Sequence, residues 1–285
     1  MFEGYVCGAI KITGQVSPMR STKRVKTGIP GLDEALGGGI PEGNVVLVSG
    51  LCGSGKTIFS LQFLHSGAVE CGERGAYIAL DEKPEIIRRR AKPFGWDLRD
   101  LELDNQIAIL DAYATLAKLP TAEKIKVLGP LETTSFITGI LETLERVRAK
   151  RVVIDSITAF AYQFGDTKKI RDVILRVFAL LRELKCTAII TSEIEEGQLS
   201  RWGVEEFLAD GVIRLYPFTE NGKTSSRALR IIKMKGTKHP LGLIPFEINE
   251  NGISLDITRV RSTEAVTSVE PLETAGAVEK EKFYY

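Results

Sequence analysis

Eight consecutive residues, Gly50 to Thr57, have the composition and spacing of a loop that binds phosphate. They read GLCGSGKT and match the pattern GxxxxGK[ST] at every position. The glycines let backbone N–H groups turn inward around an anion, and a following helix adds the positive end of its dipole. We expect Lys56 to reach the β- and γ-phosphates of ATP and the Thr57 hydroxyl to ligate Mg²⁺. The expected ATP-binding residues of this loop are Gly50, Cys52, Gly53, Ser54, Gly55, Lys56, Thr57 and Ile58.

A carboxylate at the end of another apolar run is expected to support the metal. Val152 to Ile154 are apolar and Asp155 follows them, which is the pattern of a Walker B aspartate that holds Mg²⁺ through water. An aspartate at the end of a strand can instead cap the following turn. The phosphate loop upstream favours the metal-binding interpretation.

Two adjacent acids, Asp81 and Glu82, follow a further apolar run and are candidates for orienting the attacking water. Ligands of an open parallel sheet bind outside the C-terminal ends of its strands. Carboxylates placed there would repel a triphosphate, so their presence favours a catalytic role. The alternative is a helix start, in which acids close to Pro84 and Glu85 interact with the N-terminal dipole.

The elements that must position these residues alternate between strand and helix. Such alternation predicts an α/β fold with a mostly parallel sheet covered by helices on both faces. From about Gly211 the helical spacing stops and turn signals separate short apolar runs, which predicts an antiparallel extension of the sheet. The expected strands are 45–49, 76–80, 107–110, 151–154, 187–191, 211–216, 226–235, 244–248 and 253–255, and the expected helices are 57–70, 135–150, 168–185 and one that begins at Pro84.

Bulk composition narrows the class of protein. The 285 residues are 44% hydrophobic and 26% charged with a net charge of +1, so no strong overall field attracts nucleic acid or an anionic membrane. Scattered cysteines predict reduced thiols in the cytoplasm and no zinc site, and no apolar run is long enough to span a membrane. The four cysteines are Cys7, Cys52, Cys71 and Cys186.

Three regions are expected along the chain. Residues 1–20 form a poorly defined N-terminal extension, which is either a short added arm or an artefact of translation that begins at Met19 rather than Met1. Residues 21–260 form the patterned domain. Residues 261–285 have little to bury and predict a flexible tail. An unstructured end is favoured, and a contact of the final Phe-Tyr-Tyr with a protein partner is the alternative.

Several separate segments together resemble a KaiC domain of the RecA/RadA superfamily. The resemblance covers about residues 24 to 256 and predicts a single-domain KaiC-like ATPase with a RecA-like P-loop NTPase fold. The segments are VKTGIPGLD at 25–33, GGGIP at 37–41, DEKPE at 81–85, FGWDL at 94–98, RWGVEEF at 201–207 and IKMKGT at 232–237.

The resemblance implies a ring-shaped homo-oligomer, usually a hexamer, with ATP between neighbouring subunits. It implies that Lys233 and Lys235 reach the γ-phosphate of the neighbour's ATP, and it places Thr237 and His239 at the nucleotide. On sequence pattern alone the two lysines are favoured as solvated charges on a strand. With the resemblance the role in trans is expected, for Lys233 more than for Lys235.

Two departures from the family pattern change the expected roles. The family normally has two glutamates where this chain has Asp81 and Glu82, so the water-orienting role is placed on Glu82 first. The autophosphorylated domain of the family carries a Ser-Thr pair where this chain has Glu206 and Phe207, which argues against an autokinase.

The leading hypothesis is a Mg²⁺-dependent ATPase that acts as a regulatory or signalling switch. A DNA-binding recombination or repair ATPase is an alternative, since relatives in the superfamily bind single strands through basic loops. Here the segment from Glu193 to Gly203 contains three glutamates and one arginine, which disfavours nucleic acid without excluding it. The basic run Arg88 to Arg90 is expected to be solvated or paired. An autokinase is the third hypothesis.

Overall fold

The computed structural model describes most of the patterned domain. The described residues are 23–116, 121–123, 125–126, 133–160, 166–195, 197–220 and 223–261. The expected extension at 1–20, the choice between Met1 and Met19, and the expected tail after Arg261 lie outside them.

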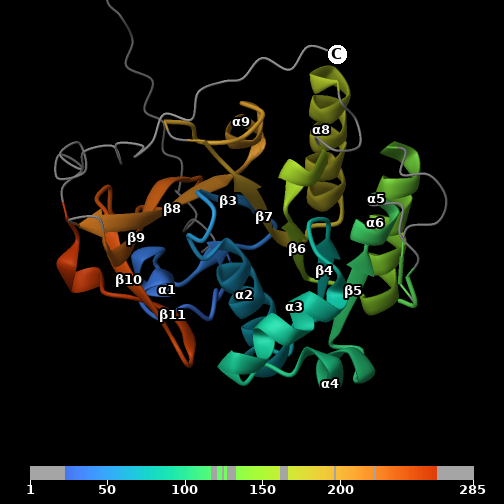
Figure 1. Cartoon of the computed structure of the whole chain (residues 1–285), viewed down its shortest axis with the longest axis horizontal. Helices are drawn as coiled ribbons and strands as arrows, with labels where there is room; N and C mark the ends of the chain where they lie inside the picture. Colours follow the sequence, from blue (N-terminus) through green and yellow to red (C-terminus); the bar gives the residue numbers. More distant parts are fainter. Residues whose placement is uncertain are drawn as a thin grey trace, which may run out of the picture.

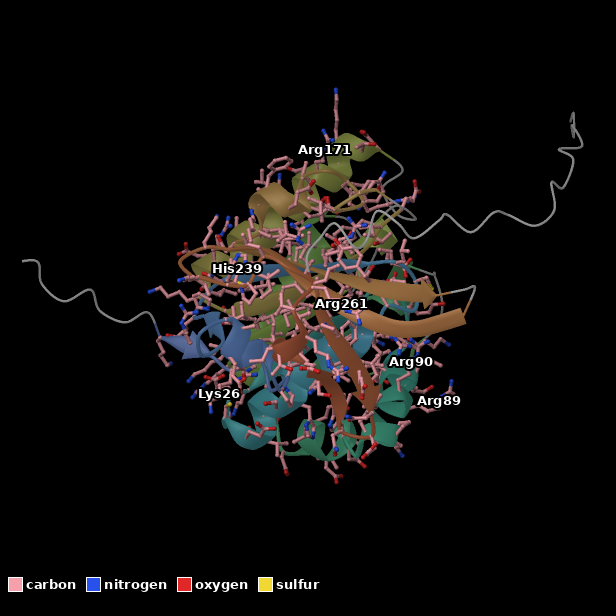
Figure 2. The ribbon with its side chains drawn as sticks, turned by 90° about the vertical axis from the view of Figure 1, so that its left-hand side faces the viewer. Lys26, Arg89, Arg90, Arg171, His239 and Arg261 are labelled. Atoms are coloured by element: carbon pink, nitrogen blue, oxygen red, sulfur yellow. The ribbon has the colours of Figure 1, made fainter. Side chains whose placement is uncertain are left out.

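Within the described residues a nine-stranded sheet forms the centre of the domain, in the order β11-β10-β9-β8-β3-β7-β6-β4-β5 (Figure 1). Neighbouring strands from β8 to β5 run parallel, whereas β9, β10 and β11 pair antiparallel. Figure 2 views the domain from this antiparallel side. The predicted α/β fold with a C-terminal antiparallel extension is confirmed. The strands are β3 (Val45–Gly50), β4 (Gly75–Ala79), β5 (Ile107–Asp111), β6 (Arg151–Asp155), β7 (Thr187–Glu193), β8 (Gly211–Glu220), β9 (Lys223–Met234), β10 (Ile244–Asn249) and β11 (Gly252–Leu255), and a separate pair consists of β1 (Arg24–Val25) and β2 (Ile40–Pro41).

Helices cover both faces of this sheet. On one face lie α1 (Leu32–Ala35), α2 (Lys56–Glu70), α3 (Pro84–Ala91) and α4 (Leu98–Leu103); on the other lie α6 (Thr133–Val147) and α8 (Thr167–Glu183). Two helices are short: α5 (Tyr113–Leu116) follows β5, and α9 (Glu205–Leu208) precedes β8. The helix predicted at Pro84 begins there, because proline at the first position lacks only an N–H that would be unpaired anyway.

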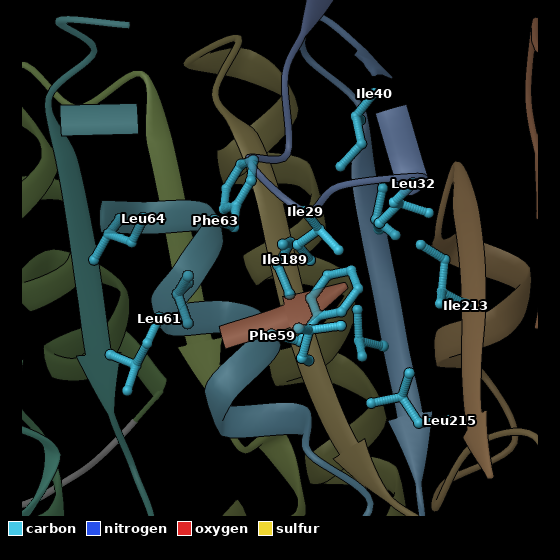
Figure 3. Close-up of a cluster of buried hydrophobic side chains, with 14 of the residues drawn as sticks. Ile29, Leu32, Ile40, Phe59, Leu61, Phe63, Leu64, Ile189, Ile213 and Leu215 are labelled. Atoms are coloured by element: carbon cyan, nitrogen blue, oxygen red, sulfur yellow. The ribbon is translucent and has the colours of Figure 1, made fainter. Parts of the chain in front are cut away.

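The core consists of two apolar clusters, one on each face of the sheet. Successive residues of β3 alternate between them, as a strand buried on both faces requires: Val46 and Val48 join one cluster, Val45 and Leu47 the other. Burial of each such side chain contributes about 1.5–3 kcal/mol. Figure 3 shows part of the first cluster, where Phe59, Leu61, Phe63 and Leu64 of α2 lie with Ile189, Ile213 and Leu215 of the strands.

The hairpin of β8 and β9 is longer than the sequence predicts. Pro217 suggests that β8 ends near Tyr216, yet pairing continues, with Pro217 opposite Arg227. Beyond Leu215, β8 pairs only with β9, because the register with β3 ends at Gly50. The missing N–H of Pro217 therefore removes no bond to β3, as is usual for proline at a sheet edge.

Candidate functional site

The phosphate loop connects the end of β3 to the start of α2. Gly53 and Gly55 have φ values of 75° and 104°, which is the left-handed region that favours glycine. A Cβ on Gly50 would lie 2.5 Å from Ser54 Oγ and 2.8 Å from the Leu215 carbonyl oxygen. No side chain caps the N-terminus of α2. The first N–H groups of α2 are thus free to bind an anion.

Lys56 is buried inside this loop. Its ammonium donates hydrogen bonds to the carbonyl oxygens of Gly50 and Leu51, both at 3.0 Å, and lies 3.8 Å from the Glu193 carboxylate. Burial lowers the pKa of Lys56, and the nearby charges of Glu193 and Asp155 oppose that effect. The loop therefore encloses a cation held by weak acceptors, which a phosphate group can replace.

Asp155 and Thr57, the expected metal ligands, are in direct contact. The Thr57 hydroxyl donates to Asp155 Oδ2 at 2.9 Å. Two further hydroxyls donate to the same carboxylate: Tyr77 to Oδ2 and Thr191 to Oδ1, each at 2.5 Å. Burial, followed by the charge of Asp155, raises the pKa of Tyr77, so its phenol stays protonated and remains a donor. Three hydroxyls from different elements thus fix one carboxylate beside the phosphate loop.

Asp81 and Glu82 follow β4 at the same edge of the sheet but have different surroundings. Asp81 accepts a hydrogen bond from the Ser156 N–H at 3.1 Å. Although Asp81 has an exposed surface, the protein around its carboxyl removes water and raises its pKa to about 6. Glu82 instead forms an ion pair with Arg90 at 2.6 Å. Burial raises the pKa of Glu82, and the Arg90 guanidinium opposes this.

The basic run on α3 is largely paired, as expected. Arg88 donates to the carboxylates of both Glu102 and Glu123, and Arg90 pairs with Glu82. Because these ion pairs neutralise the arginines, less positive charge is left to bind the phosphate backbone of a nucleic acid.

Lys233 and Lys235 are not brought to the phosphate loop of their own chain. Gly50 is level with Leu215, which faces Leu229, whereas Lys233 lies four positions further along β9. At the usual rise of a strand this is about 13 Å towards the opposite edge of the sheet. Lys233 donates to the Glu206 carbonyl oxygen at 2.6 Å, and burial lowers its pKa.

The other residues of this segment have structural partners. Lys235 pairs with Asp210 at 2.8 Å, and the Thr237 hydroxyl accepts a hydrogen bond from Arg24 at 3.0 Å. His239 Nδ1 lies 3.0 Å from the Pro240 carbonyl oxygen, and Figure 2 shows His239 well separated from Arg90 of α3. In the described part of the chain, the hydrogen bonds and ion pairs given above for this segment are to residues outside the loop Gly50–Thr57.

Glu205 was not expected from the sequence, yet it organises the segment that follows β7. It is fully buried and accepts hydrogen bonds from the Ser200 hydroxyl at 2.7 Å and from the N–H groups of Trp202 and Val204. Phe207, two residues further along α9, is 77% exposed. The only sequence signal for Glu205 is that a carboxylate follows three residues able to form a tight turn around it.

Some classes of site are absent from the described part of the chain. It contains no cluster of three or more histidine, cysteine or acidic side chains that could hold a metal ion. No described helix is long and apolar enough to cross a membrane.

Comparison with known proteins identifies a matching family model and several similar proteins. A family model described as "ATPase: KaiC" matches residues 25–259. The circadian clock oscillator protein KaiC of Synechococcus elongatus is 37% identical over 241 residues, which are 84% of this chain and 45% of that protein. The chain thus spans less than half the length of this clock protein.

Two relatives from the archaeon Pyrococcus horikoshii match nearly over their full lengths. A UPF0273 protein is 41% identical over 234 residues, which are 81% of this chain and 93% of that protein. The crystal structure of a KaiC-like protein superimposes with a TM-score of 0.72 at 39% identity, over 82% of this chain and 99% of that one.

Proposed function

Because this chain belongs to the KaiC family of ATPases, we propose that it binds ATP in the loop Gly50–Thr57 and hydrolyses it with the help of Mg²⁺. One observation carries the proposal: the buried ammonium of Lys56 and the Thr57–Asp155 pair meet at the start of α2. The lysine offers a charge for phosphate, and the pair offers hard oxygen ligands for a divalent cation.

The donor set at Asp155 suits Mg²⁺ in particular. Mg²⁺ keeps several waters and uses one or two protein oxygens together with substrate phosphates, rather than a complete protein cage. Thr57 and Asp155 supply two such oxygens. When bound, the metal would neutralise charge that develops on the phosphates.

The chain's own side chains then divide the remaining work. Lys56 would exchange the carbonyl oxygens of Gly50 and Leu51 for phosphate oxygens. Glu82 would release Arg90 and orient the attacking water, since the Arg90 side chain that pairs with its carboxylate is exposed. Asp81 is the second candidate for that task, although its hydrogen bond from Ser156 favours a supporting role.

The proposal includes a ring-shaped homo-oligomer, a hexamer by resemblance, in which each ATP lies between two subunits. Lys233 would act on the γ-phosphate of the neighbour, with Lys235, Thr237 and His239 close to the same nucleotide. The position of Lys233 towards the opposite edge of the sheet from the phosphate loop supports a role in trans rather than in cis. Change of the nucleotide would alter the subunit contacts, which suits a regulatory switch.

Phosphate release from ATP by the purified chain tests the proposed activity. We expect release that requires Mg²⁺, stops with a chelator and is abolished by Lys56→Ala. Lys26→Ala is the matched control, because Lys26 is an exposed lysine away from the loop. Undiminished release by a clean Lys56→Ala preparation would remove the assignment of the loop.

A further inference from the structure

The carboxylate of Asp155 is held by two hydroxyls that the family resemblance does not assign. Tyr77 lies in β4 and Thr191 in β7, the two strands that flank β6 in the sheet. Their hydroxyls donate to different oxygens of Asp155, Tyr77 to Oδ2 and Thr191 to Oδ1, both at 2.5 Å. The carboxylate is thereby clamped from both sides of its own strand.

We infer that Tyr77 and Thr191 are positioning residues that hold Asp155 in the orientation required to bind a divalent metal. The inference rests on the proposed nucleotide function and goes beyond it, because it assigns the metal affinity of the site to two residues outside the phosphate loop. Second partners of this kind orient metal ligands in many proteins, and their loss typically weakens metal binding 10–100-fold.

The number of hydrogen bonds supports this assignment. A carboxylate has about four lone-pair positions. The hydroxyls of Tyr77, Thr191 and Thr57 occupy three of them, two on Oδ2 and one on Oδ1. Thr57 and Asp155 would together hold the metal. The hydrogen bonds from Tyr77 and Thr191 would stay on the carboxylate when the Thr57 hydroxyl serves the metal, and would keep the carboxylate in place.

The surroundings of Tyr77 separate this role from ordinary packing. Tyr77 is 1% exposed and belongs to the apolar cluster on the α2 face. A phenylalanine would fill nearly the same space, so packing alone does not require the hydroxyl. Its partner is the one carboxylate at the end of β6 that adjoins the phosphate loop. The hydroxyl therefore serves Asp155 rather than the core.

Binding of Mn²⁺ to the ADP-loaded full-length chain tests the inference without measuring turnover. Free Mn²⁺ is counted by electron paramagnetic resonance while the metal is titrated. We expect Tyr77→Phe and Thr191→Val to weaken Mn²⁺ binding by about tenfold or more. ADP affinity in the presence of EDTA should stay within about twofold of the parent, because neither residue contacts the phosphate loop backbone.

Two controls keep the test specific. Thr191→Ser retains the hydroxyl and should retain the Mn²⁺ affinity that Thr191→Val loses. Tyr113→Phe removes a half-buried phenol on α5, which follows β5, a strand that β4 separates from β6, and should change nothing. Parental Mn²⁺ affinity in both Tyr77→Phe and Thr191→Val would overturn the inference while leaving the proposed function intact. A parent chain that binds Mn²⁺ and ADP no better than Lys56→Ala would remove the proposed function, and the inference with it.

Discussion

A mixture of two inactive variants offers a quantitative test of the shared site. Glu82→Gln damages the half of the site that carries the phosphate loop, whereas Lys233→Ala damages the half that a neighbour would supply. In the single chain these residues lie at different places: Glu82 follows β4 and pairs with Arg90, and Lys233 lies on β9 and contacts Glu206. A mixed ring can therefore contain intact sites even though a ring of either variant alone has none.

The expected recovery follows from the arrangement of a head-to-tail ring. Each site takes the phosphate loop and Glu82 from one subunit and Lys233 from the neighbour. A site is therefore intact when the first subunit carries Lys233→Ala and the neighbour carries Glu82→Gln. At equal amounts each condition holds for half of the subunits, so about one quarter of all sites regain both groups, whatever the ring size. Phosphate release should reach about a quarter of the parental rate and fall on either side of the equal mixture.

The assay is steady-state phosphate release after the two variants have been unfolded together and refolded, with mixed assembly verified by differently tagged subunits. Mixing Glu82→Gln with Lys56→Ala is the matched control, because both changes damage the same half and no site is restored. Absence of recovery in verified mixed rings, or equal recovery in the control, would refute the trans arrangement.

Two further predictions concern stability and pH. Arg151 is fully buried, pairs with Glu73 at 2.9 Å and stacks on Phe63. Glu73→Ala leaves this charge buried without its partner, so it should lower the free energy of unfolding, measured by urea titration, by about 3 kcal/mol. Arg151→Met removes the charge itself and should lower the free energy of unfolding by less, and equal losses would contradict this. The pKa of Asp81 is raised from 3.8 to about 6, so the folded chain holds this proton more tightly than the unfolded chain and loses stability as the pH rises from about 4 to about 6. The free energy of unfolding of Asp81→Asn, relative to that of the unmodified chain, should therefore increase by about 1 kcal/mol between pH 5 and pH 7.5, after allowance for solvent screening. A difference that stays the same at both pH values would contradict the environment assigned to Asp81.

The sequence predicts the parts of this domain whose signals are local. The phosphate loop is one uninterrupted pattern between a strand and a helix, and Asp155 directly follows an apolar run. The alternation of strands and helices was sufficient for the fold class, which the sheet order confirms. The roles of the individual site residues stay predictions, which the variants above test.

The parts that the sequence does not predict depend on register between distant strands. Tyr77 and Thr191 look like ordinary members of buried strands, and only the order β4-β6-β7 brings their hydroxyls to Asp155. Likewise, the pairing of Lys56 with Glu193 follows from β3 and β7 ending level with each other. No spacing within one segment encodes such contacts.

Equilibrium binding of labelled ATP to the intact chain, with Mg²⁺ present, tests the central claim most directly. The account predicts saturable binding that ADP displaces, and an affinity about 10–100-fold weaker in Lys56→Ala, because a charge-assisted hydrogen bond to phosphate is lost. The Lys26→Ala chain should bind like the parent. ATP binding that is absent from the folded parent, or that Lys56→Ala leaves unchanged, would contradict the account.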